Sequence, residues 1–567
     1  MKLQQGFVVS CEKTAEQNSE NYFAIGVNRT MRKFFVFILI SLFTACNGST
    51  GTEPPVAHTQ VSSITETIVP STSVSTQNPV ETSPPQPLPY PTSNGPDEFP
   101  EGYNPLSGLP VSDPARLEYP AILLSVSHFP AAARPQAGFS FMPFVYEYYI
   151  TEGATRHVGV VYGEFPEPEI PLHGECEIRA EPMIQTNNIL GNRVWHDENE
   201  NGIQDPREGG IGGICVNLLD ENESVIQQTT TDSNGYYGFN APAGSYSIEI
   251  EKPSWLEFTQ KNIGNEGMDS DADQESGRTP SVNITSTSLF WDAGLVPSSN
   301  VTPTPDPSVE LPKAEMGPIR SGRIFYRYMG GMYQDSCLIY ASADPEVLAQ
   351  IPGCATVAHT IQGGGAMLSL ERMARISEQN KKFNPNFNYT SNLFSDEPPT
   401  GGRPALELQE YWALLNQSKW TYDAASESWW RYVDESDPDT AGVLHPEVDR
   451  LNNRQLKFEN VILMFAEHIV IEPTIVDINL SPGNRGNAYL FRDGKKYDIR
   501  WSTFATEYEQ ETGRARPLKF INLDGSPAAL KPGHTWVIIF TMQSRLDDLS
   551  NGIWRARFFA PPGAKAN

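Results

Sequence analysis

The chain has 567 residues and a formal net charge of −28, with 41 Lys and Arg against 69 Asp and Glu. That length exceeds one ordinary domain, so we expect about two to four domains. The acidic balance excludes a nucleic-acid-binding protein, because such proteins need a basic footprint. The hydrophobic fraction of 39% is high enough for packed cores and excludes a wholly disordered chain.

A targeting signal lies inside the chain. Residues 31–46, MRKFFVFILISLFTAC, place two basic residues before a short apolar run that ends on small residues and Cys46. The run is too short to cross a bilayer and has the order of a signal peptide. Its end resembles a bacterial lipoprotein processing site, so we expect residues 31–45 to be removed and Cys46 to carry lipid. The alternative is a secreted protein whose signal peptide is cleaved near this position and which carries no lipid. Residues 1–30, which precede the signal, are interpreted as an overextended gene start.

Two segments have the composition of flexible connections. Residues 46–97 are rich in Ser, Thr, Pro and Gln, with no period and few large apolar residues. Such a segment cannot repay the entropy of folding, so we predict a disordered tether. Residues 297–312, which contain TPTPDPS, are a second predicted linker. The signal and the tether together predict an extracytoplasmic protein. Its partner is the membrane, to which the lipid on Cys46 would anchor it.

Four cysteines remain for the folded part once Cys46 and the one in the start segment are set aside. Disulfides persist in the oxidising compartment that export implies. Cys337 and Cys354 enclose a strand-like run and a short helical run, so they could meet, and we expect them to be bonded. No Cys-x-x-Cys or Cys/His cluster occurs in the sequence, which argues against zinc or redox chemistry.

The stretch DENENGIQDPRE at residues 197–208 has the register of the 12-residue calcium loop, with Gly202 at the sharp turn. Every oxygen-bearing position is filled. The ligands predicted for this loop are Asp197, Asn199, Asn201, the carbonyl of Ile203, Asp205 and Glu208. A second run of alternating acids, Asp269, Asp271 and Asp273, could supply another site or complete the first. The alternative for each run is a solvated acidic turn.

The calcium-type loop lies in a block without helical flanks. Residues 188–296 alternate in hydrophobicity between NG, GG and PAG turns, which predicts a small β-sandwich. GNRVWHDENENGIQD, TTTDSNGYYGF, DSDADQESGRT and WDAGL resemble the calcium-binding B domains of staphylococcal SD-repeat adhesins, which are prealbumin-like and related to collagen-adhesin B repeats. The resemblance implies that Ca²⁺ pins a loop between two strands, and that the domain is a stiff spacer.

The sequence around this insert reads as one interrupted host domain, residues 101–170 and 313–415. Strand-like runs such as AILLSVS and FVYEYYI mix with helical ones such as AMLSLERMARISEQNKK, which predicts an α/β or α+β fold. Residues 418–545 contain GNAYLFRDGKKYDIRWST, whose DG turn between alternating runs predicts a hairpin. The expected architecture is therefore multidomain: a mixed host split by a β-sandwich, then a mostly β C-terminal domain.

A second resemblance covers nearly everything after residue 101 except the insert. The phrases RPQAG, VYE, EGATR, GPIRSGR and YTS, at residues 134–138, 145–147, 152–156, 317–323 and 389–391, resemble the YerB-like family of bacterial lipoproteins. The two halves of that family are domains of unknown function, so the resemblance implies no activity. One departure is that a His-Asn pair usual before YTS stands here as Phe387-Asn388.

The charged residues within these phrases support the leading functional hypothesis. The side chains predicted to line a ligand site are Arg134, Glu147, Glu152, Arg156, Arg320 and Arg323. Guanidinium groups suit bidentate capture of carboxylate or phosphate. We expect an anionic, envelope-associated ligand, with Arg320 and Arg323 as the principal contacts. The alternative is that the arginines pair with the two glutamates inside the fold.

Two other function classes stay open. A hydrolase could use Glu147 and Glu152 as acid and base, but on a strand their side chains would face opposite sides. No Gly-x-Ser-x-Gly, His-Glu-x-x-His or Walker-type motif occurs, so whether the protein is an enzyme stays uncertain. The third class is a calcium-stiffened adhesion or display protein.

Overall fold

The computed structural model describes residues 93–177, 189–205, 208–264, 267–285, 287–298, 311–351, 353–356, 366–385, 387–424 and 426–565. The predicted start segment, the signal peptide with Cys46, nearly all of the tether and most of the second linker lie outside these residues. Within the described ranges no helix combines the length and the apolar character needed to cross a membrane.

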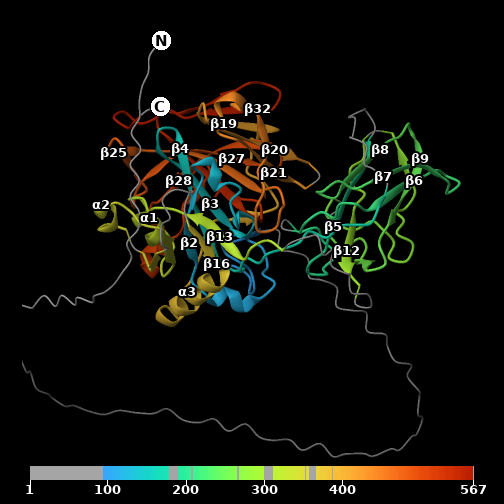
Figure 1. Cartoon of the computed structure of the whole chain (residues 1–567), viewed down its shortest axis with the longest axis horizontal. Helices are drawn as coiled ribbons and strands as arrows, with labels where there is room; N and C mark the ends of the chain where they lie inside the picture. Colours follow the sequence, from blue (N-terminus) through green and yellow to red (C-terminus); the bar gives the residue numbers. More distant parts are fainter. Residues whose placement is uncertain are drawn as a thin grey trace, which may run out of the picture. The chain divides into compact units, whose positions relative to one another are not determined.

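The host is built on one large mixed sheet (Figure 1). At its centre lie, in order, β2 (Ile122–Ser127), β4 (Ala154–Val161), β3 (Phe144–Thr151), β30 (Thr535–Thr541) and β24 (Asn460–Ala466). On the β2 side follow β13 (Glu315–Ile319), β14 (Cys337–Tyr340), β15 (Ala355–Thr356) and β16 (Ala366–Ser369). On the β24 side follow β27 (Arg485–Arg492), β28 (Lys495–Ser502), β29 (Lys519–Ile521) and β18 (Arg403–Pro404). The central strands are nearly continuous apolar runs, as expected for strands covered on both faces.

A second sheet is formed by the C-terminal part of the chain. Its strands are β19 (Glu407–Ala413), β20 (Asn416–Asp423), β21 (Ser428–Asp434), β22 (Leu444–Pro446), β23 (Lys457–Phe458), β31 (Arg545–Asp548) and β32 (Ile553–Arg557). In the described part of the host there are also two small strand pairs, β1 (Ser93–Asn94) with β17 (Phe394–Ser395) and β25 (His468–Glu472) with β26 (Ile475–Ile478). The boundary expected between residues 415 and 418 falls in the β19–β20 hairpin, and β30 pairs with β3. The two predicted host domains therefore share their sheets.

Helices are few in the described part. The α-helices are α1 (Tyr326–Met332), α2 (Pro345–Leu348), α3 (Leu370–Phe383) and α4 (Glu507–Thr512). The short 3-10 helices are η1 (Pro114–Glu118), η2 (Ala131–Ala133), η3 (Phe139–Phe141) and η4 (Pro438–Thr440). The hydroxyl of Ser369 accepts from the backbone of Arg372 and caps α3, whose last turn carries two lysines.

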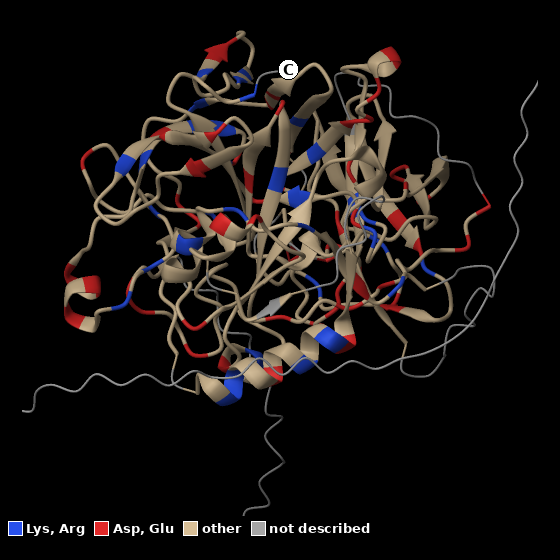
Figure 2. Cartoon of the chain, turned by 60° about the vertical axis from the view of Figure 1, so that its left-hand side comes forward, with Lys and Arg blue, Asp and Glu red and all other residues tan. Residues whose placement is uncertain are grey.

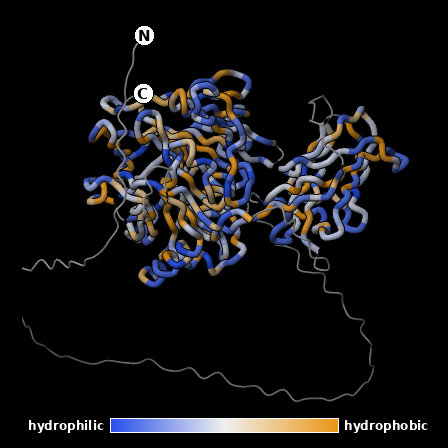
Figure 3. Tube along the Cα trace, in the orientation of Figure 1, coloured by the Kyte–Doolittle hydropathy of each residue, from blue (hydrophilic) through white to orange (hydrophobic). Residues whose placement is uncertain are grey.

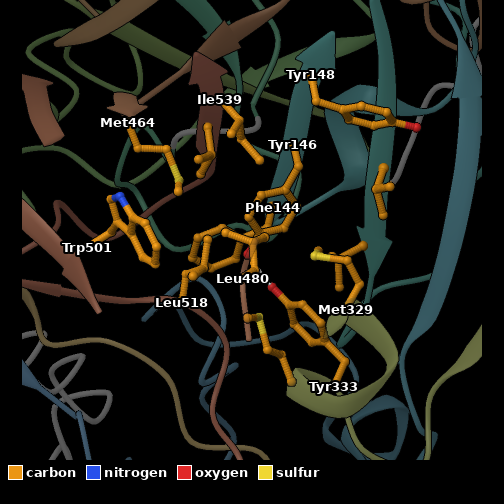
Figure 4. Packing of buried hydrophobic residues seen from close by; sticks show 14 of the residues in the cluster. Phe144, Tyr146, Tyr148, Met329, Tyr333, Met464, Leu480, Trp501, Leu518 and Ile539 are labelled. Carbon is orange, nitrogen blue, oxygen red and sulfur yellow. Dashed lines mark hydrogen bonds between the residues drawn. The ribbon is translucent and has the colours of Figure 1, made fainter. Parts of the chain in front are cut away.

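The central sheet has a hydrophobic core on each face because alternate side chains of a strand point to opposite sides. Phe144, Tyr146 and Tyr148 of β3 lie on one face, with Met329 and Tyr333 around α1 (Figure 4). On the other face, large side chains of the central sheet and of the second sheet pack into a separate core. Hydrophobic stretches accordingly lie along the inner strands and hydrophilic ones on the outer loops (Figure 3).

The insert is a β-sandwich of two four-stranded sheets, with a hydrophobic core of its own. One sheet contains β10 (Leu256–Phe258), β12 (Ala293–Pro297), β5 (Ile189–His196) and β8 (Tyr236–Asn240). The other contains β11 (Val282–Ile284), β9 (Gly244–Glu251), β6 (Cys215–Leu219) and β7 (Val225–Thr230). The predicted architecture, a mixed host split by a sandwich and followed by a mostly β segment, is confirmed, with strands dominating throughout.

Two disulfides occur in the described part. Cys337 is bonded to Cys354 with their Cα atoms 5.2 Å apart, and this is the pair expected from the sequence. Cys176 is bonded to Cys215, with Cα atoms 5.1 Å apart, and ties the segment that enters the insert to β6. Because disulfides persist in oxidising compartments, the two bonds indicate an extracytoplasmic protein.

Candidate functional site

The register of the β3–β4 hairpin separates the predicted site residues. Tyr148 pairs with Arg156, whereas Glu147 pairs with His157. Paired residues of adjacent strands share a face, and neighbours along a strand do not. Arg156 therefore lies on the α1 face of the central sheet, and Glu147 lies on the face toward the second sheet.

On the α1 face, three arginines form what we call the arginine cluster, Arg156, Arg320 and Arg323. Nη1 of Arg156 donates to the carbonyl oxygen and the hydroxyl of Ser321, at 2.8 and 3.0 Å. The backbone N–H of Arg320 donates to the carbonyl oxygen of Ser125 on β2 at 2.8 Å, and the carbonyl of Arg323 accepts from the backbone of Tyr326. These backbone bonds hold the segment between β13 and α1 against the sheet.

No carboxylate forms an ion pair with Arg156 or Arg323 among the residues that the structure describes. The groups around them are neutral hydroxyls: the Tyr148 and Tyr326 hydroxyls bond to each other, and Tyr326 also bonds to Ser125 at 2.7 Å. Nε of Arg323 is buried and has no hydrogen-bond partner within the described part of the chain, although the side chain as a whole is partly exposed. Elsewhere in the host, Lys and Arg are interspersed with Asp and Glu (Figure 2).

The electrostatics of the cluster reflect burial and mutual repulsion. Burial, followed by the charge of Arg156, lowers the pKa of Arg323 to about 10. The same two causes lower the pKa of Arg320. The hydroxyls of Tyr148 and Tyr326 are also held neutral, because burial raises both of their pKa values. The charge of Arg156 thus lies close enough to Arg320 and Arg323 to repel theirs.

On the opposite face, Glu147 is fully buried and bound by groups from the C-terminal part of the chain. Its Oε2 accepts from Arg431 Nη2 at 2.9 Å and from Trp536 Nε1 at 3.1 Å. Its Oε1 accepts from the Thr155 hydroxyl at 3.2 Å. Burial alone would raise the pKa of Glu147, but Arg431 and two nearby histidines hold it well below its ordinary value.

Arg431 binds two further buried carboxylates. Its Nε lies 2.6 Å from Glu447 Oε2, and its Nη1 lies 3.5 Å from Glu410 Oε1. The guanidinium also lies over the rings of Trp420 and Trp536, 5.0 and 4.4 Å from their centroids. Burial raises the pKa of Glu410 to about 7, and the charge of Glu147 adds to this shift while Arg431 opposes it. The guanidinium of Arg431 therefore contacts the carboxyl groups of three glutamates.

The other predicted ligand-site residues lie apart from the arginine cluster. Arg134 forms an ion pair with Asp434 at 3.6 Å, and its Nη2 donates to Ser436 at 3.1 Å. Glu152 lies in the β3–β4 turn with φ of 49°, and its carboxylate is 2.5 Å from Lys565 Nζ. Glu147 and Glu152 thus have separate partners, and the structure does not bring them together as an acid and base pair.

The acids of the calcium-type loop accept hydrogen bonds from the backbone of the same loop. The carboxylate of Asp197 accepts from the backbone of Asn201 and Gly202, at 3.1 and 2.8 Å, and Gly202 has φ of 79°. Glu208 accepts from the backbone of Asp205 at 3.0 Å. Burial, then the charges of Asp205 and Asp197, raises the pKa of Glu208 to about 9. These converging acids fit a hard cation with oxygen ligands.

The other predicted ligands of the loop have neighbours within the insert. The amides of Asn199 and Asn201 both donate to Asp205, at 2.7 and 2.9 Å. Ile203 forms a β-bridge to Asp269, which ties the second run to the first.

Asp271 and Asp273 have other neighbours. Asp271 Oδ2 accepts from the backbone of Asp292, a buried acid that the sequence analysis does not identify. Burial raises the pKa of Asp292 well above its ordinary value, and Asp271 contributes to that shift. Asp273 is exposed and accepts from the backbone of Ser276 within its own turn, so it does not join the other two acids.

Comparisons with known proteins identify two parts of the chain. Residues 188–295 match the family model described as SdrD B-like domain. Residues 409–537 match the model described as Protein of unknown function (DUF3048) C-terminal domain. The resemblances to SD-repeat B domains and to the YerB-like family are thereby confirmed. The biochemical function of the host is unknown.

The curated relatives match through the insert. Serine-aspartate repeat-containing protein F of Staphylococcus epidermidis (strain ATCC 12228 / FDA PCI 1200) is 47% identical over 90 residues, which is 16% of this chain and 6% of the relative. Serine-aspartate repeat-containing protein D of Staphylococcus aureus (strain MW2) is 39% identical over 111 residues, 19% of this chain and 8% of the relative. The solved YerB protein from Bacillus subtilis has a TM-score of 0.41 and 14% identity, covering 77% of this chain and 96% of that chain.

We predict that Glu410 makes stability depend on pH. Its folded pKa of about 7 lies above its ordinary value, so the folded chain holds a proton that the unfolded chain releases. The free energy of unfolding should therefore fall as the pH rises from about 4.5 to about 7, by at most about 1.4 kcal/mol per pH unit. Glu410→Gln should remove this slope when urea denaturation is measured across that range, whereas the exposed Glu371→Gln should retain it. Equal slopes in wild type and Glu410→Gln would contradict the prediction.

Proposed function

We propose that the host binds an anionic ligand associated with the cell envelope, a glycan or peptide that carries phosphate or carboxylate groups. The observation that supports this function most directly is the arginine cluster, in which Arg156 and Arg323 lack an acidic partner among the described residues. Uncompensated buried charge is costly, and a guanidinium binds phosphate or carboxylate through paired hydrogen bonds. Arg320 and Arg323 are the principal contacts because their side chains are partly exposed.

The contrast with the other charged residues supports the same assignment. Arg431 and Arg134 both have carboxylate partners, and both lie outside the arginine cluster. Arg156 instead donates to Ser321, so its remaining charge adds to that of its two neighbours. The host therefore contains arginines of two kinds: those that bind acids within the fold, and those, such as Arg323, that face hydroxyls and other arginines.

The proposed setting is the outer side of a cell membrane. Lipid on Cys46 would anchor the chain, and the following Ser- and Pro-rich segment would hold the folded part away from the surface. A ligand of the envelope would then be within reach of the host. An adhesion or display role remains the alternative, and it is supported by the insert alone.

Replacing Arg323 tests anion binding. Arg323→Gln should weaken binding of glycerol phosphate and of glutarate by about 10-fold or more, because a hydrogen bond to a charged group contributes about 1.5–3 kcal/mol. Isothermal titration of the full chain in EGTA-containing buffer measures the affinity and keeps calcium out of the reaction. Comparison of the two probes shows whether phosphate or carboxylate is preferred.

The matched control is Arg375→Gln, which removes one positive charge from the exposed face of α3. Its affinity should equal that of wild type once ionic strength is held constant. The proposal is wrong if Arg323→Gln binds the probes as wild type does. It is also wrong if that substitution lowers the free energy of unfolding by several kcal/mol, because the arginine would then be architectural.

For the insert, we propose that the loop of residues 197–208 binds Ca²⁺. The support is the convergence of Asp197, Asp205 and Glu208, together with the glycine turn at Gly202. Ca²⁺ takes six to eight oxygen ligands, which carboxylates, amide oxygens and a backbone carbonyl provide. Bound calcium would stiffen the end of the sandwich where this loop leaves β5.

Calcium should stabilise the insert by mass action. At about 100 times its Kd, calcium should raise the free energy of unfolding by about 2.7 kcal/mol. Glu208→Gln should lose most of this gain, because it removes the bidentate carboxylate, whereas Asp273→Asn should keep it. Calcium titration followed by thermal denaturation of the full chain measures both effects. Equal calcium responses of Glu208→Gln and wild type would exclude this loop as the site.

A further inference from the structure

The face of the central sheet opposite the arginine cluster contains a group of metal-ligating side chains. His128 follows β2, Glu147 lies on β3 and His157 lies on β4, and all three are fully buried. Nδ1 of His128 is 3.6 Å from Glu147 Oε1, and Nε2 of His157 is 3.8 Å from the same oxygen. One ligand atom from each residue lies within 4.8 Å of the other two.

The histidines of this group have unmet hydrogen-bonding capacity. Among the described residues, neither ring nitrogen of His157 has a hydrogen-bond partner and Nε2 of His128 has none either, whereas Nδ1 of His128 bonds to the hydroxyl of Thr155. Leaving a buried polar group unsatisfied costs about 1–3 kcal/mol. The ring of His157 is surrounded by the rings of Phe139 and Trp536, whose centroids are 5.0 and 5.1 Å away, so these neighbours offer it no acceptor. A metal ion would use the lone pair of His157 Nε2, the nitrogen nearest Glu147.

The local charge balance also favours a bound cation. Glu147 and Glu447 share the guanidinium of Arg431, and all three side chains are buried. Arg134, the other nearby cation, is paired with Asp434. The region therefore carries excess negative charge, and such a charge is expensive away from water unless it is neutralised. A dication on the histidine side of Glu147 would supply this compensation.

We propose that His128, Glu147 and His157 bind a transition-metal dication of the zinc class. Two imidazole nitrogens and one carboxylate oxygen suit zinc better than calcium or magnesium, which prefer oxygen ligands throughout. Tetrahedral bonds of about 2.0–2.1 Å hold ligand atoms about 3.3 Å apart. Metal binding would therefore require the side chains to move closer, from separations of 3.6 Å, 3.8 Å and at most 4.8 Å. The hydroxyl of Thr155 lies 2.7 Å from His128 Nδ1 and 3.2 Å from Glu147 Oε1, so its hydrogen bond to His128 would break when that nitrogen binds the metal, and a water molecule would be the fourth ligand.

The surroundings indicate a structural role for this metal. Arg431 and Trp536 hold Oε2 of Glu147 and leave Oε1 to face the histidines, as an outer shell that orients a metal ligand does. All three ligands are fully buried, so a substrate has no open path to the metal, and this burial favours a role in stabilising the fold. Metal binding would tie the segment after β2 to the β3–β4 hairpin and thereby stabilise the sheet on which the arginine cluster lies.

The test is metal uptake by the full chain after unfolding in EDTA and refolding with one equivalent of Zn²⁺ or Co²⁺. Glu208→Gln is included in every sample, so that the calcium-type loop does not contribute. About one equivalent of zinc should remain after gel filtration, and Co²⁺ should give the intense visible absorption of a four-coordinate site.

His157→Gln should weaken zinc binding by more than about 100-fold, which exceeds the loss typical of replacing a residue that only orients a metal ligand. The control His468→Gln replaces a partly buried histidine of β25 and should bind as the parent does.

Two results would overturn the proposal. The first is a parent chain that refolds but retains no zinc and shows no Co²⁺ absorption, which decides the matter even if His157→Gln fails to fold. The second is a folded His157→Gln chain that holds as much zinc as the parent, because the metal would then lie elsewhere.

Discussion

The host depends on one buried cation, Arg431, held between two sheets. Arg431 belongs to β21 of the second sheet, and its partner Glu147 belongs to β3 of the central sheet, 284 residues earlier in the chain. Glu410 and Glu447 complete the group. A buried ion pair contributes little net stability, but breaking one is costly because it leaves a charge without compensation. The interaction therefore fixes how the two sheets face each other.

The same strand pair separates two opposite charge environments. Arg156 on one face lies among hydroxyls and other arginines, and Glu147 on the other face lies among acids and histidines. Alternation along β3 and β4 is enough to produce this separation, because neighbouring residues point to opposite sides. A ligand site and a structural centre can thus share two strands without sharing side chains. The insert contributes its own core and its own acidic loop, so its proposed calcium chemistry is independent of both.

Much of the fold could be predicted from the sequence because local signals determine it. Turn dipeptides and alternating runs identify the insert, and Asp197 and Glu208 of the calcium register both accept hydrogen bonds from the backbone of their loop. The joining of the host domains could not be predicted, because it depends on the parallel pairing of β3 with β30, two strands that lie far apart in the chain. A parallel pair leaves no turn signal between its strands.

For the same reason the candidate site was predictable only in part. Arg156, Arg320 and Arg323 lie together as expected, but Glu147 contacts Arg431, and no local sequence pattern signals that contact. The spacing of Cys and His along the sequence argues against a zinc site. His128 and His157 are distant in the sequence, and the antiparallel pairing of β2 with β4 brings them side by side.

The measurement that tests the central role of Arg431 most directly is a double-mutant cycle on the free energy of unfolding with Arg431→Met and Glu147→Gln. Arg431→Met alone should cost about 3–5 kcal/mol, because it leaves buried acids without their cation. The double variant should cost clearly less than the sum of the two single variants, since the second change removes one of those acids. If Arg431→Met costs no more than the exposed Arg545→Met, or if the two costs simply add, then the pair does not hold the sheets together.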